Sequence, residues 1–174
     1  IFRICPLQGQ PPQEIGPPMG SYVVENGFFL LNDGSGRLLR GALRVENGRI
    51  ARISRSIPKQ KGEKRINLSG LLVIPGFVQT HVHLCQTLFR NFADDLELLD
   101  WLSQRIWPFE GAHNEKSLYA SARLGIAELL KGGTTTILDM GTVHHTAALF
   151  EAVRDAGLRA TIGKAMMDAP DPRI

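Results

Sequence analysis

The stretch Val73-Ile74-Pro75-Gly76-Phe77-Val78-Gln79-Thr80-His81-Val82-His83 decides the fold class of this chain. The apolar run starts at Leu71, so we expect one buried strand over residues 71–83 that ends at the histidines. Alternate residues of a strand lie on the same face, and both imidazoles therefore point the same way. The carboxyl ends of strands carry the chemistry in parallel α/β architectures, so this stretch predicts a functional site.

Downstream segments alternate between helix and strand patterns. We expect helices over 94–106, 115–131 and 146–156, and strands over 134–139 and 159–167. Asp94 and Glu97 resemble a capping box, and Pro108 is expected to stop that first helix. Asn114 and Gly132 are expected to cap the second helix at its two ends. This alternation predicts a parallel sheet or an α/β barrel.

Residues 19–70 carry short strand patterns with turn signals between them. Asn47-Gly48 predicts a two-residue hairpin turn, with Glu46 opposite Arg49 and Val45 opposite Ile50. Asn26-Gly27 and residues 33–36 are further turn signals. These strands predict a small β module that is too small to be stable alone.

Residues 1–18 differ from the rest of the chain. They hold five of the ten prolines and show no periodicity, whereas regular alternation begins just after Met19. We expect a disordered upstream extension here, with Met19 as the natural start; a genuine flexible arm is the alternative. The predicted domains are thus 1–18, 19–70 and 71–174.

Composition argues against several classes of protein. The hydrophobic fraction of 43% and the charged fraction of 21% are typical of a globular protein, and no apolar run has the length of a membrane helix. The net charge of +3 comes without a clustered basic face, which argues against nucleic-acid binding. The two cysteines, Cys5 and Cys85, cannot form a disulfide framework, so we expect a cytoplasmic protein.

Two imidazoles on one strand face suit a divalent metal of borderline softness, such as Zn²⁺ or Fe²⁺. The alternative is a pair of ordinary histidines, because so short a motif also arises by chance. A catalytic zinc takes three protein ligands, and His113, His144 and His145 fall at no predicted strand end. The residues alone therefore predict half a metal site on an α/β scaffold.

The 73–83 stretch resembles the first barrel strand of the amidohydrolase superfamily. Other segments resemble its branch of S-adenosylhomocysteine/methylthioadenosine deaminases, related purine and pyrimidine deaminases, and triazine chlorohydrolases: Leu88-Phe89-Arg90, Asp94-Asp95-Leu96, Trp101-Leu102, Pro108-Phe109-Glu110, and Gly132-Gly133-Thr134-Thr135-Thr136 with Leu138-Asp139-Met140. The hairpin at 45–50 resembles the amino-terminal β-sandwich strands of that branch. The resemblance extends from about residue 20 to the end of the chain.

This resemblance implies a metal-dependent (β/α)8 TIM barrel beside a small composite β-sandwich, with His81 and His83 as two ligands of one divalent metal. Zn²⁺ is expected first and Fe²⁺ is the alternative. The family takes its remaining ligands and its proton-transfer residues from later strands, so we expect no catalytic residue of that kind here. A whole barrel needs about 250 residues. We therefore expect an inactive amino-terminal fragment of a longer protein, and its exposed barrel edges predict self-association or a homo-oligomer.

The activity implied for the full-length parent is hydrolysis of non-peptide C–N bonds. We expect hydrolytic deamination of an aminated purine, nucleoside or related small heterocycle by metal-activated hydroxide. Gln86, Trp101 and Glu110 match substrate-binding positions of the branch, where a carboxylate accepts hydrogen bonds from ribose hydroxyls. A packed tryptophan and solvated polar side chains are the alternatives. The alternative functions are a triazine-type hydrolytic dehalogenase and a non-catalytic binding module.

Three further residues have weaker assignments. Asp139 ends the second predicted barrel strand, where it either orients a ligand histidine or has a buried structural role. Cys85 is expected to be a plain loop thiol rather than a soft metal ligand. Lys164 lies on the third predicted strand, so we reject it as the bridging carbamylated lysine that two-metal relatives carry on the fourth.

Overall fold

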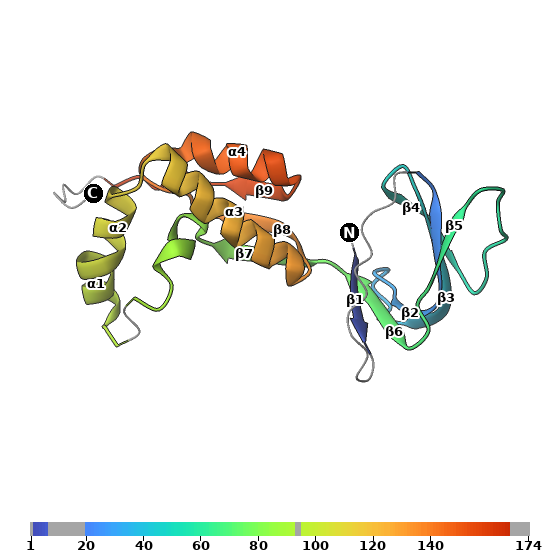
Figure 1. The fold of residues 1–174 in the computed structure, drawn as a ribbon. Coiled ribbons are helices and arrows are strands. Elements are labelled where there is room, and N and C mark those ends of the chain that lie inside the picture. Colours follow the sequence, from blue (N-terminus) through green and yellow to red (C-terminus); the bar gives the residue numbers. More distant parts are fainter. Residues whose placement is uncertain (1, 7–19, 93–94, 168–174) are drawn as a thin grey trace. The chain divides into compact units, whose positions relative to one another are not determined.

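The computed structural model describes residues 2–6, 20–92 and 95–167, and the chain forms two compact units, 1–76 and 77–174 (Figure 1). The sequence placed this boundary at residue 70. The difference arises because the apolar run of residues 71–83 contains two strands rather than one. β6 (Leu71–Pro75) belongs to the first unit, and β7 (Phe77–Val82) belongs to the second. Pro75 cannot donate a hydrogen bond, which favours a strand end at this point.

The first unit is a six-stranded mixed sheet with the order β1-β6-β2-β3-β4, in which β5 also pairs with β2. Its other strands are β1 (Phe2–Pro6), β2 (Tyr22–Leu30), β3 (Leu38–Glu46), β4 (Arg49–Ser54) and β5 (Lys64–Asn67). β1 runs antiparallel to β6, so five residues of the segment predicted to be disordered form a strand. The rest of that segment, and Met19, lie outside the described residues.

The predicted hairpin joins β3 to β4. Asn47 and Gly48 both have positive φ, at 50° and 72°, and the register sets Glu46 opposite Arg49 as predicted. The Asn26-Gly27 signal was wrong as a turn. Asn26 instead has φ 64° at a β-bulge inside β2, where the register with β3 shifts between Glu25 and Gly27. A bulge with a left-handed residue uses the same backbone conformation as a positive-φ turn, so the two share a sequence signal.

The first unit has an apolar core and a buried ion pair. The buried residues of the core are Val24, Phe29, Leu43, Val45, Leu68, Leu71 and Val73. Arg44 Nε donates to Glu63 Oε1 at 2.7 Å, Arg44 Nη2 donates to Pro58 O at 2.7 Å, and the Glu63 side chain is 2% exposed. The hydrogen bonding of Arg44 to Glu63 holds the pKa of Glu63 below its ordinary value. The pair therefore ties β3 to the connection that precedes β5.

The second unit is a parallel three-stranded sheet of order β7-β8-β9, with β8 (Thr134–Asp139) in the centre and β9 (Arg159–Ile162) at one edge. Two helices, α3 (Glu115–Lys131) and α4 (Thr146–Ala156), pack on each other and on the sheet (Figure 1). Their shared core contains Leu84, Cys85, Leu118, Ala122, Ile126, Ile137, Ala148, Leu149, Ala152 and Leu158. This is a mixed α/β fold, as predicted.

Helices α3 and α4 and the central strand β8 match their predicted bounds. Asn114 caps α3 by accepting a hydrogen bond from Ser117 N at 3.0 Å, and Gly157 ends α4 with φ 66°. One detail at the end of α3 differs. Gly132 stays right-handed at φ −72°, and the left-handed residue is Gly133 at φ 86°. The last strand also ends earlier than predicted, at Ile162.

The first predicted helix of this unit differs most from the structure. The chain first forms the 3₁₀ helix η1 (Leu84–Phe89), and then α1 (Leu98–Trp101), a π-helical turn η2 (Leu102–Ile106) and α2 (Trp107–Gly111) in succession. Asp94 of the predicted capping box lies outside the described residues. Pro108 does not stop the helix. The wide π turn just before it relaxes the backbone ladder at the point where proline has no N–H to donate.

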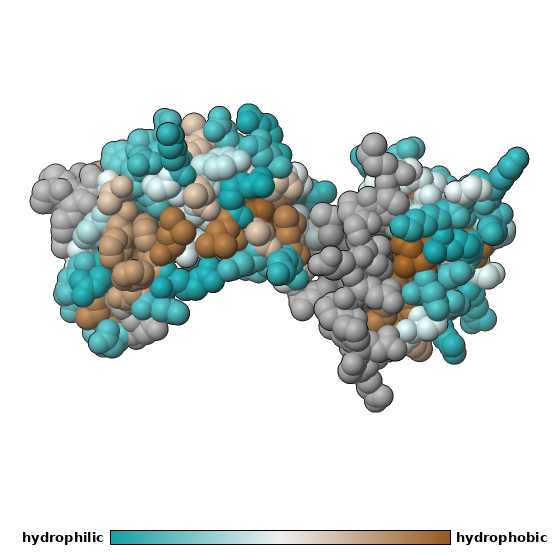
Figure 2. Space-filling view, viewed as in Figure 1, coloured by the Kyte–Doolittle hydropathy of each residue, from teal (hydrophilic) through white to brown (hydrophobic). Residues whose placement is uncertain are grey.

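The surface of the second unit carries many apolar side chains, which Figure 2 shows in brown. Its exposed large apolar residues include Phe77, Val78, Leu88, Phe92, Leu98 and Leu99. Val78 is 64% exposed because it lies on β7, an edge strand of the described sheet. Among the residues that the structure describes, no helix combines the length and the apolar character needed to cross a bilayer.

Candidate metal and substrate site

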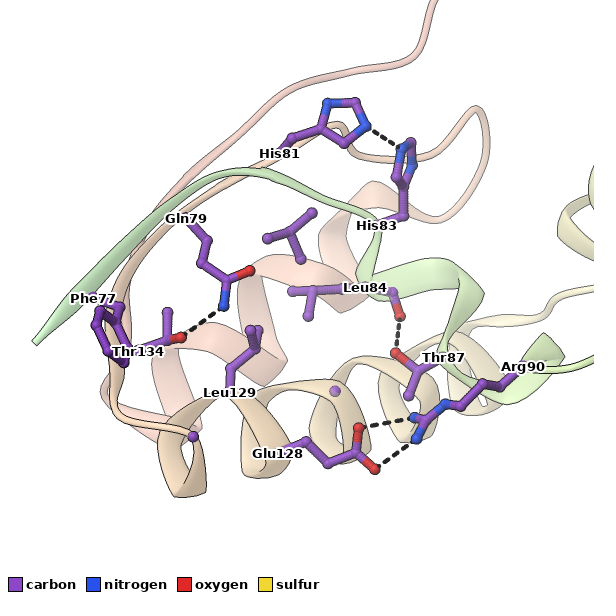
Figure 3. Close-up of a pocket in the computed structure, with 13 residues that line it drawn as sticks. Phe77, Gln79, His81, His83, Leu84, Thr87, Arg90, Glu128, Leu129 and Thr134 are labelled. Carbon is purple, nitrogen blue, oxygen red and sulfur yellow. Dashed lines mark hydrogen bonds and ion pairs between the residues drawn. The ribbon is translucent and has the colours of Figure 1, made fainter. Parts of the chain in front are cut away.

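Two histidines meet at the carboxyl end of β7. His81 and His83 turn their Nε2 atoms toward each other at 3.1 Å, with ring centroids 4.9 Å apart (Figure 3). Burial, and the neighbouring His81, lower the pKa of His83 below its ordinary value. A lowered pKa keeps the imidazole neutral, and the neutral form is the one that binds metals.

The geometry of this pair fits one shared metal ion. Two nitrogens bound tetrahedrally to the same zinc at about 2.0–2.1 Å lie about 3.3 Å apart, close to the 3.1 Å between the two Nε2 atoms. A complete catalytic site would need at least one more protein ligand. Within the described ranges, no group of three or more His, Cys, Asp and Glu side chains is arranged to hold a metal. The spacing of the pair is compatible with two ligands of one metal, and their role as ligands stays a prediction.

An open groove of about 690 Å³ lies beside the histidines, between β7, η1 and α3 (Figure 3). Gln79 Nε2 donates to Thr134 Oγ1 at 2.9 Å on one wall of the groove. Arg90 makes two hydrogen bonds of 2.9 Å to the carboxylate of Glu128 on another wall. The groove thus has polar groups that are already paired and an apolar floor that includes Leu84 and Leu129.

Two of the three predicted substrate residues lie next to His83. Gln86 Nε2 donates to Glu110 Oε1 at 2.9 Å and is 3.4 Å from His83 Nδ1. Trp101 is different: it ends α1 and is half-buried, and no hydrogen bond or ring contact among the described residues joins it to Glu110. The structure therefore brings together His81, His83, Gln86 and Glu110, but it does not link Trp101 to them.

Cys85 is a buried hydrogen-bond donor on η1. The prediction that it is a plain loop thiol was therefore wrong. Cys85 is 0% exposed, and its Sγ donates to Glu110 Oε1 at 3.3 Å and to Gly141 O at 3.5 Å. Burial, together with the nearby carboxylate of Glu110, raises the pKa of Cys85 well above its ordinary range. The thiol therefore keeps its proton and helps to hold Glu110 in place.

Asp139 anchors the backbone around the site. It is 1% exposed, its Oδ2 accepts from Leu84 N at 2.7 Å, and its Oδ1 accepts from Gly141 N at 2.7 Å. Burial raises the pKa of Asp139, while these two backbone hydrogen bonds oppose the rise. Both bonds go to amides rather than to an imidazole, which favours the structural role over the orientation of a ligand histidine.

One supporting residue was missed by the sequence prediction. His113 is 9% exposed, its Nε2 lies 2.8 Å from Cys85 O, and its Nδ1 lies 2.9 Å from Ser117 Oγ. Its ring also packs on Phe89 with centroids 5.0 Å apart. His113 therefore fixes η1 against the start of α3. The sequence feature that could have identified His113 is its position directly before Asn114, the residue that caps α3.

The other basic candidates lie away from these contacts. His144 and His145 are exposed, and His145, directly before α4, has φ 57°. Lys164 follows β9, and its Nζ donates to Val143 O and to Thr146 Oγ1. Its place after the third strand of the described parallel sheet agrees with its rejection as a bridging ligand.

The second unit is thus a parallel α/β unit with two convergent imidazoles at a strand end. The model of the amidohydrolase family matches residues 72–173, and the chain belongs to this family. The resemblance found in the sequence is therefore confirmed.

Several of the proteins that this chain resembles are deaminases. The chain is 40% identical over 143 residues to a 5'-deoxyadenosine deaminase of Methanobrevibacter smithii, covering 82% of this chain and 32% of that protein. The structure is similar to an adenosine deaminase from Xanthomonas campestris with bound zinc, at a TM-score of 0.75 and 29% identity over 90% of this chain and 36% of that one. A triazine hydrolase from Arthobacter aurescens, at a TM-score of 0.76 and 20% identity over 87% and 37% of the two chains, shares the fold. The chain thus spans about a third of the length of the curated relative.

Proposed function

We propose that these residues form the amino-terminal part of an enzyme that hydrolytically deaminates an aminated purine or its nucleoside. The observation that carries the proposal is the convergence of His81 and His83 at a strand end, beside the carboxylate of Glu110. The deaminase names of the relatives support it. The similarity to a triazine hydrolase, at 20% identity, supports only the fold, so dehalogenation remains the weaker alternative.

In this proposal His81 and His83 are two ligands of one divalent ion, and zinc is the metal. The bound zinc of the adenosine deaminase relative supports this choice. When bound, such an ion lowers the pKa of a water molecule toward neutrality and so supplies hydroxide near pH 7. The lowered pKa of His83 favours metal binding, because protons then compete less with the metal for the ligand nitrogen.

The substrate residues of the proposal are Glu110, Gln86 and Trp101. Glu110 presents a carboxylate, which accepts hydrogen bonds from two vicinal hydroxyls of a ribose. Cys85 and Gln86 hold this carboxylate through one oxygen. Trp101 offers an aromatic face, which suits stacking against a purine ring.

We further propose how the two units contribute to the fold of a complete enzyme. The β strands of the first unit form part of a composite β-sandwich, and the parallel unit forms the first part of a (β/α)8 barrel. The remaining ligands and the proton-transfer groups come from segments that these 174 residues do not contain. A cytoplasmic location and self-association stay predictions from the sequence.

Ammonia release from adenosine, 5'-deoxyadenosine and guanine by the zinc-loaded full-length protein tests the proposal. We expect release from at least one substrate, and loss of both zinc and activity in His83→Ala. His144→Ala, which removes an exposed imidazole, is the matched control and should keep both. No ammonia from any purine with zinc bound, or chloride release from a chlorinated triazine instead, would overturn the deaminase assignment.

A separate experiment tests whether Glu110 contacts the ribose of the substrate. Glu110→Gln should raise KM for adenosine derivatives by about 10- to 140-fold, because one charge-assisted hydrogen bond contributes about 1.5–3 kcal/mol. KM for a free base should change little, since a base has no ribose to lose. Glu115→Gln, an exposed carboxylate in the first turn of α3, is the control. Equal losses on nucleoside and base would contradict the ribose contact.

A further inference from the structure

Met140 directly follows the last residue of β8 and is 53% exposed, although its side chain is large and apolar. Its backbone N–H donates to Val82 O at 2.9 Å, and Val82 separates the two candidate metal ligands, His81 and His83. We propose that Met140 is a specificity-determining residue whose side chain forms an apolar wall against the purine ring of the substrate. This inference rests on the proposed function and adds a contact with the base to the ribose contact proposed for Glu110.

The first step of the argument concerns the face of the sheet on which Met140 lies. Asp139 pairs with Val82 in register, and Val82 packs against the core that the sheet shares with the helices. Side chains alternate between the two faces along a strand. The residues next to this register pair, His81 and His83 on β7 and Met140 after β8, therefore lie on the opposite face. Figure 3 shows both histidines on the side of β7 that is away from α3.

The second step concerns the space around Met140. Ile137 and Asp139, on the helix side of β8, are buried, whereas Met140 is exposed. Its neighbour on the chain that follows β9 is Gly163, whose N–H donates to Asp139 O at 2.9 Å. A Cβ at Gly163 would lie 3.0 Å from Met140 O, so a glycine allows the two backbones to lie this close and adds no side chain there. In the described part of the chain, Met140 thus has open space beside the histidine pair.

The third step separates Met140 from Leu138, the preceding side chain on the same face. Leu138 lies within β8, whereas Met140 lies just beyond the carboxyl end of that strand. In a (β/α)8 barrel, layers of strand side chains fill the interior, and the site lies at the carboxyl ends of the strands. We therefore expect Leu138 to be packed inside the parent barrel and Met140 to face the bound substrate.

The fourth step follows from the chemistry of the side chain. In the proposed reaction, the ring carbon that carries the amino group reacts beside His81 and His83, so the base rather than the ribose lies at this end of the sheet. A thioether is apolar and polarisable, and it makes favourable contacts with aromatic rings. Met140 would therefore hold a flat heteroaromatic base by shape and dispersion, and hydrogen bonds from other groups would orient it.

Four substitutions in the full-length protein test this contact. Met140→Ala removes the side chain, and Met140→Leu keeps most of its apolar volume. Leu138→Ala shortens the neighbouring side chain on the same face, one layer deeper. Leu124→Ala, at an exposed leucine on α3, is the matched control. The measurements are KM for adenosine and for a free purine base, the zinc Kd from chelator competition, and the thermal midpoint.

We expect Met140→Ala to raise KM for adenosine and for the free base by the same factor, because both contain the ring. The rise should be about 2- to 12-fold, the range of a contact between a thioether and an aromatic ring. Met140→Leu should restore most of the affinity. Leu138→Ala should lower the thermal midpoint and leave both KM values unchanged, and Leu124→Ala should match the parent. The zinc Kd should hold in every variant.

A second measurement needs no turnover. Hydrogen peroxide transfers one oxygen atom to an exposed thioether, which gives the sulfoxide and water. Purine riboside, a purine nucleoside without the amino group, should slow this oxidation at Met140 in the full-length protein, whereas ribose alone should not. Mass spectrometry of the peptide that contains Met140 follows the reaction.

If the protein deaminates purines, unchanged KM values in a folded, zinc-bound Met140→Ala variant would overturn the proposal. A rise of KM confined to adenosine would assign Met140 to the ribose, and a weaker zinc Kd would assign it to the metal; either would also overturn it. If the protein deaminates no purine but purine riboside still protects Met140, the proposed function fails and the contact with the ring stands. Absence of both deamination and protection would overturn both.

Discussion

Replacing Asp139 by asparagine tests whether this buried carboxylate holds the site loops together. In the parent, one oxygen accepts from Leu84 N and the other from Gly141 N, both at 2.7 Å. Asparagine keeps one acceptor and puts an NH2 group where the other was, so one bond becomes a contact between two donors. A hydrogen bond to a charged group contributes about 1.5–3 kcal/mol, and an unsatisfied buried donor costs about 1–3 kcal/mol.

Part of that loss is offset because the substitution removes a buried charge, the same burial that raises the pKa of Asp139. We therefore expect a net destabilisation of about 2–3 kcal/mol. Each kcal/mol lowers the melting temperature of a unit of this size by about 4–8 °C. The affected amides should also exchange about 30- to 140-fold faster if the loss is local.

Urea unfolding and amide hydrogen exchange by NMR provide the two measurements. The control is Asp100→Asn, which changes an exposed carboxylate on α1 and should stay within about 0.5 kcal/mol of the parent. If Asp139→Asn also stays within that range, and exchange at Leu84 and Gly141 is unchanged, the anchoring role is refuted.

Three further predictions follow from other contacts. Because the pKa of Glu63 is lowered, the ionised carboxylate stabilises the first unit at any pH above its ordinary pKa of 4.5. This contribution is lost as the pH falls through the lowered pKa. Parent and Glu63→Gln, compared by urea unfolding from pH 2 to 7, should therefore differ near neutrality and converge in acid; a constant gap would contradict the ion pair with Arg44. In a Cys5→Ser background, native Cys85 should react with iodoacetamide at pH 8 far more slowly than in urea, because it is buried and its pKa is raised. Gly48→Ala should destabilise the first unit by about 1 kcal/mol because φ is 72° there, and no change in the urea midpoint would refute the left-handed turn.

Local patterns predicted the regular elements well. Helices α3 and α4 were predictable because an amphipathic pattern ends at a defined cap, Asn114 for one and Gly157 for the other. The hairpin at Asn47-Gly48 was predictable because only a few residue types adopt positive φ at both turn positions. The division between β6 and β7 was not predictable, because a continuous apolar run looks the same in one sheet or two.

The candidate site was predictable only in its local part. His81 and His83 are two residues apart, so strand geometry alone brings their rings together. Glu110 meets Gln86 across 24 residues, through a 3₁₀ helix and a π turn that no periodicity indicates. The burial of Cys85 depends on that same path of the chain. Family resemblance supplied Glu110, whereas contacts that depend on tertiary packing required the structure.

The pairing of β7 with β8 has a consequence for synthesis on the ribosome. Phe77 and Thr135, whose hydroxyl donates to Phe77 O, are 58 residues apart. Translation at about 5–20 residues per second separates their emergence by about 3–12 s. During this interval β7 lacks its partner strand, and its apolar residues and histidines are exposed on the nascent chain. Chaperone binding to ribosome-bound chains should therefore peak after β7 emerges and fall once β8 is made.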